Sequence, residues 1–370
     1  MNILLAPDSY KGCLTSREVC AAMEAGIKKA NNEINVMQFP SSDGGEGFCD
    51  CMRKIFGGET IKREVAYPLG NRGTAEFVYN RESKTAYIEL ASASGLTLVP
   101  KDERNILEAS TLGTGELIIE AIKLGASEIT VGLGGSATND CGMGLLYALG
   151  MRFLDSAGFE LKPCARSLSR VSYVVRDKMP DLSEINFVAA CDVKNTLCGE
   201  NGAAQVFSRQ KGATESQVAF LDEACMHFAK AVGIDPELQG AGAAGGVGAA
   251  MLSVLKADYI SGASLLVDST PFKNALERAD LLITGEGNTD SQTACGKLVS
   301  VVLEAAKARG IPAVVLSGGL SEGYEILKQY GAYDIRSLTE SGRGVEYCIN
   351  NAFELITEYA ANIVEKLLTK

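Results

Sequence analysis

The stretch Thr130–Asp140, Thr-Val-Gly-Leu-Gly-Gly-Ser-Ala-Thr-Asn-Asp, combines residue types that can bind an anion through the backbone. The apolar residues at its start predict a buried strand, and the sequence from Gly144 to Gly150 predicts a helix. A glycine-rich turn between a strand and a helix lets a ligand approach the bare backbone, and unpaired N–H groups at the helix start favour negative charge. Phosphate suits this combination best. The residues expected to bind this phosphate, which would be that of a nucleotide, are Gly134, Gly135, Ser136, Ala137, Thr138 and Asn139.

A tight packing turn is the alternative interpretation of this stretch, because glycine also permits close approach between a strand and a helix. No Walker A lysine follows the turn, and Gly-x-Gly-Gly is a weak pattern, so both interpretations stay open. The same question arises at Gly240–Ala250, which consists almost wholly of Gly and Ala. This segment is either a close-packed helix start or a second anion cradle.

Carboxylates follow several of the strand-like runs. Asp8 and Asp43 each end a short strand and precede a helix. In open α/β sheets, ligands bind beyond the carboxyl ends of the strands, so these positions are site candidates. Helix or turn capping is the alternative for either aspartate. The carboxylates in such loops are Asp8, Asp43, Glu46, Asp140, Asp192, Glu286 and Asp290.

Carboxylates together with a phosphate-binding turn favour phosphoryl transfer. In that chemistry Mg²⁺ bridges the phosphates, an acidic residue accepts the substrate proton, and cations offset charge on the transferred group. Two other classes remain open: a nucleotide-cofactor oxidoreductase acting on hydroxy acids, and a non-catalytic two-domain solute-binding protein. A dinucleotide turn would normally follow the first strand. Here that turn, Asp8-Ser-Tyr-Lys-Gly12, is not glycine-rich.

Composition limits the partners and the compartment. The chain has 370 residues with 46% hydrophobic residues, which suggests two domains, or one large domain with an insertion. A net charge of −11 without long like-charge runs argues against nucleic acid and membrane as partners. Eleven scattered cysteines, no recognisable leader and no membrane-length apolar run predict a cytoplasmic protein. The single histidine, His227, lies off the apolar stripe of its helix, so acid–base work falls to carboxylates or lysines.

The two ends of the chain differ from its middle in the pattern of predicted strands and helices. Both ends alternate short apolar strands with helices, whereas residues 61–90 read as an antiparallel meander. The predicted fold class is therefore α/β with two domains. Residues 1–58 and 279–370 form a Rossmann-like parallel-sheet domain, and residues 59–278 form an inserted mixed α/β domain carrying the Gly-rich phosphate loop. One long helix from Val345 to about Leu368 is expected to close the chain.

Several motifs, in register over essentially the whole chain, resemble those of the bacterial glycerate kinases. The family has Asn-Asp-Gly-Gly where this chain has Asn139-Asp140-Cys141-Gly142. The matching motifs are Ala6-Pro-Asp-Ser-Tyr-Lys11, Asp43-Gly-Gly-Glu-Gly47, Pro68-Leu-Gly70, Ala93-Ser-Gly-Leu96, Gly113-Thr-Gly-Glu116, Gly132-Leu-Gly-Gly-Ser-Ala-Thr-Asn-Asp140, Ala190-Cys-Asp-Val193, Gly240-Ala-Gly-Ala-Ala-Gly-Gly246, Thr284-Gly-Glu-Gly287 and Asp290-Ser-Gln292.

The resemblance implies transfer of the ATP γ-phosphoryl group to D-glycerate with Mg²⁺, giving 2-phosphoglycerate and ADP. It also implies an active site in a cleft between the two domains. The sequence itself does not distinguish 2-phosphoglycerate from 3-phosphoglycerate, because both hydroxyls belong to the same three-carbon acid. ATP and glycerate are the expected small-molecule partners, and the protein is expected to be a monomer or a homodimer.

Roles are assigned to residues as follows. Asp192, Asp290 and Lys11 are the expected catalytic residues, with one aspartate orienting the glycerate hydroxyl and the other nearer the metal. Asp290 and Glu286 are the expected Mg²⁺ ligands. The expected substrate-binding residues are Asp8, Ser9, Asp43, Arg209, Lys211 and Lys297. For each basic residue, a solvated surface position is the alternative.

Overall fold

The computed structural model describes residues 1–10, 12–42, 44–294 and 297–368, and the chain divides into two compact units. Unit 1 comprises Met1–Ser42 with Gly262–Lys370, and unit 2 comprises Asp43–Ser261. The boundaries expected from the sequence lie elsewhere, after residue 58 and before residue 279. Residues 43–58, which contain one helix, belong to unit 2, and residues 262–278, which contain two helices, belong to unit 1. No helix in the described part of the chain is long and apolar enough to cross a membrane.

Unit 1 is built on a five-stranded parallel sheet with strand order β15-β13-β11-β1-β2. The strands are β1 (Asn2–Leu5), β2 (Asn35–Gln38), β11 (Leu281–Thr284), β13 (Ala313–Ser317) and β15 (Ala332–Ser337), and a separate pair is formed by β12 (Asn288–Thr289) and β14 (Gly319–Leu320). The central strands β1, β11 and β13 are almost wholly buried, as expected of a parallel sheet covered on both faces.

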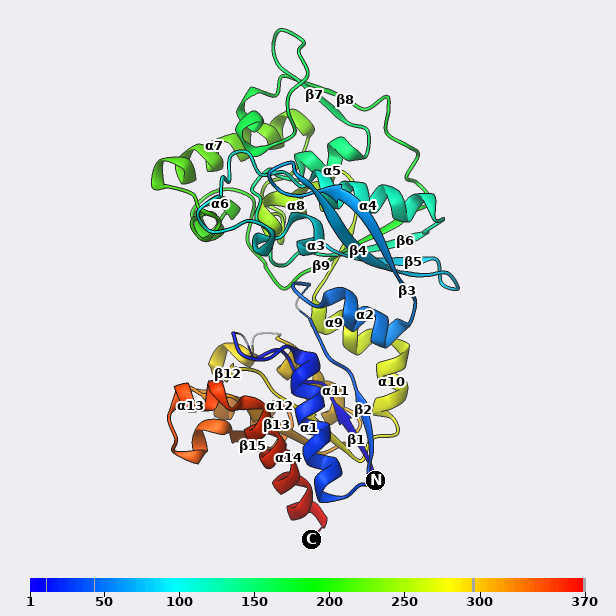
Figure 1. Ribbon diagram of the computed structural model, residues 1–370, viewed down its shortest axis with the longest axis vertical. Helices are drawn as coiled ribbons and strands as arrows, with labels where there is room; N and C mark the ends of the chain where they lie inside the picture. The colour runs from blue at the N-terminus through cyan, green and yellow to red at the C-terminus, as the bar shows by residue number, and fades with distance from the viewer. Residues whose placement is uncertain (11, 43, 295–296, 369–370) are drawn as a thin grey trace. The chain divides into compact units, whose positions relative to one another are not determined.

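Helices from both chain ends cover this sheet. The helices of unit 1 are α1 (Ser16–Ala30), α9 (Gly262–Asp268), α10 (Thr270–Leu276), α11 (Leu298–Lys307), α12 (Leu327–Tyr330), α13 (Val345–Asn350) and α14 (Ala352–Leu368). Thr15 begins α1 with a capping box that includes Glu18. Helices α1 and α14 pack side by side (Figure 1), with Gly26 so close that a Cβ there would stand 2.1 Å from the Thr357 carbonyl oxygen.

Unit 2 is built on a six-stranded mixed sheet with strand order β10-β9-β6-β5-β4-β3. Strands β3, β4 and β5 form the antiparallel meander, and β5, β6, β9 and β10 run parallel. The strands of unit 2 are β3 (Glu59–Ala66), β4 (Arg72–Asn80), β5 (Thr85–Glu89), β6 (Glu128–Gly132), β9 (Asn186–Ala190) and β10 (Asp258–Ile260), with a separate hairpin-like pair β7 (Arg152–Leu154) and β8 (Tyr173–Val175). The predicted α/β class, with a parallel sheet from both chain ends and a mixed sheet from the middle, is confirmed.

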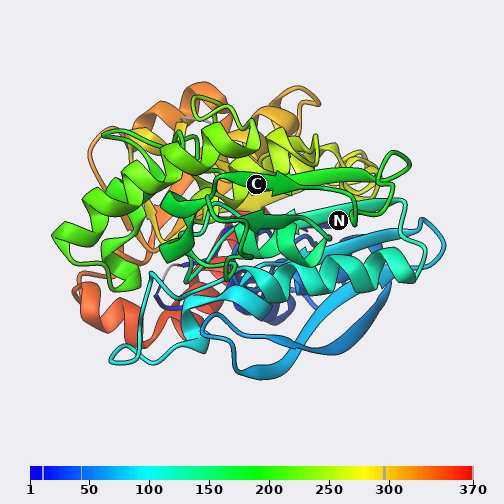
Figure 2. The same ribbon diagram turned by 90° about the horizontal axis from the view of Figure 1, so that it is seen from above.

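The helices of unit 2 are α2 (Phe48–Phe56), α3 (Ala91–Ser94), α4 (Leu112–Lys123), α5 (Met143–Ala148), α6 (Ala203–Phe207), α7 (Glu215–Val232) and α8 (Ala243–Ser253). Helix α4 lies along the β3–β4 ribbon in both views (Figures 1 and 2). Buried side chains from the sheet and from α4, α5, α7 and α8 form one continuous core. This core fixes the carboxyl ends of β5, β6 and β9, where the Gly-rich loop begins.

The C-terminal segment differs from the sequence prediction. The expected single helix from Val345 is wrong, because the helix breaks at Asn351, where φ is −122° and ψ is 27°. Two consecutive asparagines, Asn350 and Asn351, occupy the break. Asparagine side chains compete for backbone hydrogen bonds, and that competition favours helix ends over helix interiors.

Candidate active site

The Gly-rich loop, residues 133–140, connects β6 to α5 and is held by backbone bonds to three other segments. The Leu133 N–H donates to the Ala190 carbonyl (3.1 Å), the Gly134 N–H to Gly44 (2.8 Å) and the Ala137 N–H to Ser94 (2.9 Å). The N–H groups of four other loop residues donate to no protein acceptor in the part of the chain that the structure describes. They are Gly135, Ser136, Thr138 and Asn139. Unpaired N–H groups gathered in one loop are the donors that an anion site needs.

Glycine is required in this loop by close packing as well as by conformation. A Cβ on Gly134 would stand 2.2 Å from the Cα atom of Gly45, and a Cβ on Gly44 would stand 2.2 Å from the Ala190 carbonyl oxygen. Gly135 has a φ of +69° and is exposed. Gly44 and Gly45 of the Asp43-Gly-Gly-Glu-Gly47 motif therefore pack against the Gly-rich loop and the end of β9.

Asp140 holds the C-terminal end of the Gly-rich loop in place through hydrogen bonds. Its buried carboxylate accepts hydrogen bonds from the Thr111 N–H and hydroxyl, both at 2.8 Å, and from the Gly142 and Gly144 N–H groups. Burial raises the pKa of Asp140, and these hydrogen bonds oppose the shift. Asp140 thereby ties the start of α4 to the start of α5, so we assign it a structural role.

Cys141 keeps the backbone conformation that glycine would adopt. Its φ is +51°, in the left-handed region, and its side chain is buried. The Cys141 N–H donates to the Gly245 carbonyl at 3.0 Å, and a Cβ on Gly245 would stand 2.0 Å from the Thr138 carbonyl oxygen. The Gly/Ala segment thus packs against the Gly-rich loop, which favours the close-packed interpretation of Gly240–Ala250.

Lys211 and Arg209 differ sharply in environment. Lys211 is 3% exposed, and its ammonium group donates to the Ser136 hydroxyl (2.7 Å) and to the Thr138 carbonyl (2.8 Å). Burial lowers the pKa of Lys211 to about 7. Arg209 lies at the surface, where its guanidinium is bound by the Glu215 carboxylate and the Gln205 carbonyl. The structure therefore associates Lys211, and not Arg209, with the Gly-rich loop.

Two acidic residues lie at the same edge of the unit 2 sheet as the loop. Asp192 is exposed two residues beyond Ala190, which pairs with Gly132 at the end of β6. Glu89 ends β5, opposite Gly132, and accepts from the Cys49 N–H at the start of α2 (3.5 Å). Burial raises the pKa of Glu89 to about 7. Glu89 is not among the site residues expected from the sequence, although an acidic residue at the end of a predicted strand is a signal for such a site.

A second polar cluster lies at the carboxyl ends of β1, β11 and β13 in unit 1. The Asp8 N–H donates to the Gly285 carbonyl (2.8 Å), which places Asp8 and Ser9 beside the residue before Glu286. The Glu286 carboxylate is 8% exposed and accepts from the Thr293 and Thr289 hydroxyls. Burial raises the pKa of Glu286, the Asp8 carboxylate adds to the rise, and Thr293 and Lys297 oppose it. Asp8, Glu286 and Lys297 are thus electrostatic neighbours.

Asp290 is half-buried and begins a short 3₁₀ turn, Ser291–Ala294. Its Oδ1 atom accepts from the Gln292 N–H (2.8 Å) and the Thr293 N–H (3.2 Å). Asp290 therefore has at least a capping role. Of the other expected site residues, Lys11 and Asp43 lie outside the described residues.

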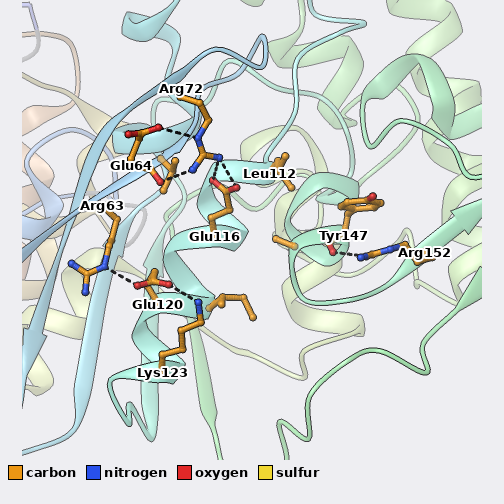
Figure 3. A pocket seen from close by; sticks show the side chains of 12 residues that line it. Arg63, Glu64, Arg72, Leu112, Glu116, Glu120, Lys123, Tyr147 and Arg152 are labelled. Atoms are coloured by element: carbon orange, nitrogen blue, oxygen red, sulfur yellow. Dashed lines mark hydrogen bonds and ion pairs between the residues drawn. The ribbon is translucent and has the colours of Figure 1, made fainter.

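A separate pocket of about 520 Å³ lies between the β3–β4 ribbon, α4 and α5 (Figure 3). Its cations are already paired: Arg63 donates to Glu120 (2.7 Å), and Arg72 donates to Glu116 (2.8 Å). Arg152 stacks on the Tyr147 ring at 4.1 Å and forms an ion pair with Glu160 at 3.2 Å. Because these partners neutralise its arginines, the pocket is a poorer phosphate site than the Gly-rich loop.

Comparison with known proteins shows which family this chain belongs to. Residues 3–368 match the model of the glycerate kinase family. The chain is 41% identical to the glycerate kinase of Bacillus cereus over 98% of this chain and 97% of that protein. It is 36% identical to the glycerate 2-kinase of Escherichia coli over 99% and 98% of the two chains. A crystal structure assigned as glycerate kinase 2 from Salmonella typhimurium LT2 superposes with a TM-score of 0.84 at 34% identity, covering 100% of this chain and 98% of that chain.

Proposed function

The chain belongs to the glycerate kinase family, and we propose that it transfers the γ-phosphoryl group of ATP to D-glycerate in a Mg²⁺-dependent reaction. Family membership makes the chain an ATP-dependent phosphotransferase and decides against the hydroxy-acid oxidoreductase and the solute-binding protein. ATP and glycerate follow as its substrates. We expect a cytoplasmic monomer or homodimer.

The Gly-rich loop is the proposed binding site of the nucleotide phosphates. The observation that carries this assignment is the set of unpaired N–H groups on Gly135, Ser136, Thr138 and Asn139. Backbone donors in a fixed loop stabilise charge on phosphate oxygens without reorganising during the reaction. Buried atoms of the same loop, Thr138 Oγ1 and Asn139 Oδ1, also have no partner among the described residues.

The residues of unit 1 fit a Mg²⁺ ion in type and number. Mg²⁺ in kinases is bound by one or two carboxylates together with substrate phosphates and water. No group of three or more His, Cys, Asp or Glu side chains in the described residues could enclose a metal, but Glu286 beside Asp8 offers two carboxylates. We propose Glu286 and Asp290 as the ligands, with Asp8 as a further candidate. The ion would neutralise charge on the phosphates.

The remaining roles concern the acceptor hydroxyl and the glycerate carboxylate. We propose that Asp192 or Asp290 accepts the proton of the attacking glycerate hydroxyl, because each lies just beyond the carboxyl end of a strand. Asp290 Oδ1 also accepts from two backbone N–H groups, those of Gln292 and Thr293. Lys297, an exposed residue that interacts with Glu286, is the proposed cation for charge developing in the transition state. Lys11, Ser9 and Asp43 remain proposed contacts to substrate.

We propose O2 of glycerate as the acceptor, giving 2-phosphoglycerate. The support is the full-length similarity to a protein named glycerate 2-kinase. A coupled assay of ADP release with and without D-glycerate tests the kinase activity, and ³¹P NMR of the product separates the two isomers. ADP release that is independent of glycerate would contradict the proposed reaction, and a 3-phosphoglycerate signal would contradict only the acceptor assignment.

A further inference from the structure

Lys211 is a buried cation in contact with the Gly-rich loop, the proposed phosphate site. It is far from the Gly-rich loop in sequence, 75 residues beyond Ser136, yet its ammonium group contacts that loop at two points. Both contacts are to uncharged oxygens, the Ser136 hydroxyl and the Thr138 carbonyl. Burying an ammonium group costs free energy unless a negative charge compensates it, and neither of these two oxygens carries a charge.

The direction of the hydrogen bond determines what Ser136 can do. An ammonium group has donors only, so the Ser136 oxygen must accept from Lys211. The hydroxyl proton of Ser136 is then available to another acceptor, and the described residues supply none. The Ser136 N–H, on the same residue, is also unpaired among them. Ser136 thus has two free donors, both of which a phosphate oxygen can accept.

The charges around Lys211 leave its positive charge available to an anion. The Asp140 carboxylate stabilises the Lys211 ammonium electrostatically, the Cys225 thiol is a further neighbour, and Arg104 lines the same small cavity as Lys211. The Asp140 carboxylate is already bound by the donors of Thr111, Gly142 and Gly144. An anion on the other side of Ser136 would supply the missing negative charge.

We propose that Lys211 is a positioning residue for phosphoryl transfer, whose ammonium group orients the Ser136 hydroxyl as a hydrogen-bond donor to a nucleotide phosphate oxygen. Lys211 acts through Ser136 and does not itself touch the nucleotide. This inference rests on the proposed binding of nucleotide phosphates by the Gly-rich loop. It replaces the direct substrate contact that the sequence suggested for Lys211.

The first test measures MgATP affinity by calorimetry for the wild type and for Lys211→Met. Loss of a hydrogen bond supported by a charge is expected to weaken binding about 10- to 100-fold. The matched control is Lys230→Met, which removes an exposed lysine from the end of α7 in the same unit. Unchanged affinity in Lys211→Met would overturn the proposal.

A double-mutant cycle separates a positioning role from a general loss of structure. If Lys211 acts through Ser136, Lys211→Met and Ser136→Ala should each weaken MgATP binding, and the double variant should be no weaker than the worse single variant. Additive losses would mean that the two side chains act independently and would overturn the proposal. Melting curves identify any variant that fails to fold.

The wild type provides a test that needs no variant. Since burial lowers the pKa of Lys211 to about 7, an anion beside Ser136 should draw a proton onto the amine. Calorimetry at pH 8 in buffers of different ionisation enthalpy should show net proton uptake on MgATP binding, and Lys211→Met should lose that uptake. Equal uptake in both proteins would overturn the proposal.

Failure of this inference and failure of the proposed function have different signatures. If Gly135→Val abolishes MgATP binding while Lys211→Met leaves it unchanged, the loop binds phosphate but Lys211 does not position it. If neither substitution affects MgATP binding, the loop itself is not the nucleotide site.

Discussion

Gly134 and Gly45 pack backbone against backbone, so closely that a Cβ on Gly134 would stand 2.2 Å from the Cα atom of Gly45. The Gly134 N–H also donates to the Gly44 carbonyl at 2.8 Å. Two glycine-rich segments almost 90 residues apart in sequence are thus in direct backbone contact at the carboxyl ends of β6 and β9. Substitutions in these segments can therefore be chosen to change either the packing between them or the N–H groups that are open to a ligand.

Gly135→Val is expected to abolish nucleotide binding while unit 2 stays folded. Gly135 is exposed with a φ of +69°, and its Cβ position is 3.2 Å from the Ala91 Cβ, so valine adds strain and covers the unpaired N–H groups. Losing two such bonds to phosphate should weaken binding on the order of 100-fold or more. The measurement is calorimetric titration with MgATP, beside a melting curve.

Gly158→Val is the control for this change. Gly158 has a φ of +84° with no atom within 4 Å of its Cβ position, so valine there adds backbone strain away from the Gly-rich loop. The control should lose similar stability and keep nucleotide affinity. Wild-type affinity in Gly135→Val would show that the loop is a packing turn.

Substitutions of Cys141 should separate backbone strain from side-chain volume. Cys141→Gly relieves a φ of +51° but removes a buried thiol, so we expect a change in unfolding free energy within about 1 kcal/mol. Cys141→Val places a β-branched side chain in a left-handed conformation within a tight core and should cost about 3 kcal/mol or more. Urea denaturation gives both values. Equal losses of unfolding free energy in the two variants would mean that the left-handed backbone at Cys141 does not affect stability.

Asp192→Asn and Asp290→Asn should distinguish the proton acceptor from the metal ligand. Asparagine at position 290 keeps the oxygen that accepts from the Gln292 and Thr293 N–H groups, so melting temperatures should change little. Loss of general-base assistance lowers kcat by about 10²- to 10⁴-fold. The metal-ligand variant should be partly rescued by high Mg²⁺ concentration, and the proton-acceptor variant should not. Values of kcat within about threefold of the wild type for both variants would remove the chemistry from these two loops.

Lys211 should make the wild-type protein more stable as pH rises above 7. The unfolded lysine keeps its proton up to about pH 10.4, whereas burial lowers the folded pKa to about 7. Between these values the unfolded state binds more protons, so stability increases with pH by up to about 1.4 kcal/mol per pH unit. Lys211→Met should lack this slope. Urea denaturation of both proteins at pH 7, 8 and 9 measures the difference, and parallel slopes would contradict a buried neutral amine.

The sequence predicted those parts of the molecule that local pattern controls. The strand predicted at the start of Thr130–Asp140 is β6, and the short strands predicted before Asp8 and Asp43 are β1 and β2. The position of the Gly-rich loop between a strand and a helix was also predicted, and its role as a phosphate site stays a prediction. These features depend on residues within a few positions of one another.

Features that depend on distant residues were not predictable. Lys211 was expected to bind substrate, with a solvated surface position as the alternative, and only the fold shows that it is buried with its ammonium group on Ser136. Glu89 gains its raised pKa from burial near the start of α2, some 40 residues earlier in the chain. The break at Asn351 reflects a local competition that apolar periodicity does not register.

The strand order of unit 1 has a consequence for biosynthesis. Strand β1 pairs with β11, so Ile3 lies opposite Leu281, and the sheet remains incomplete until β11, β13 and β15 have been made. All strands of unit 2 lie between these segments in sequence and pair only with one another. On the ribosome, unit 2 can therefore fold first, while the apolar strand β1 waits for its partner β11, more than 200 residues away in sequence.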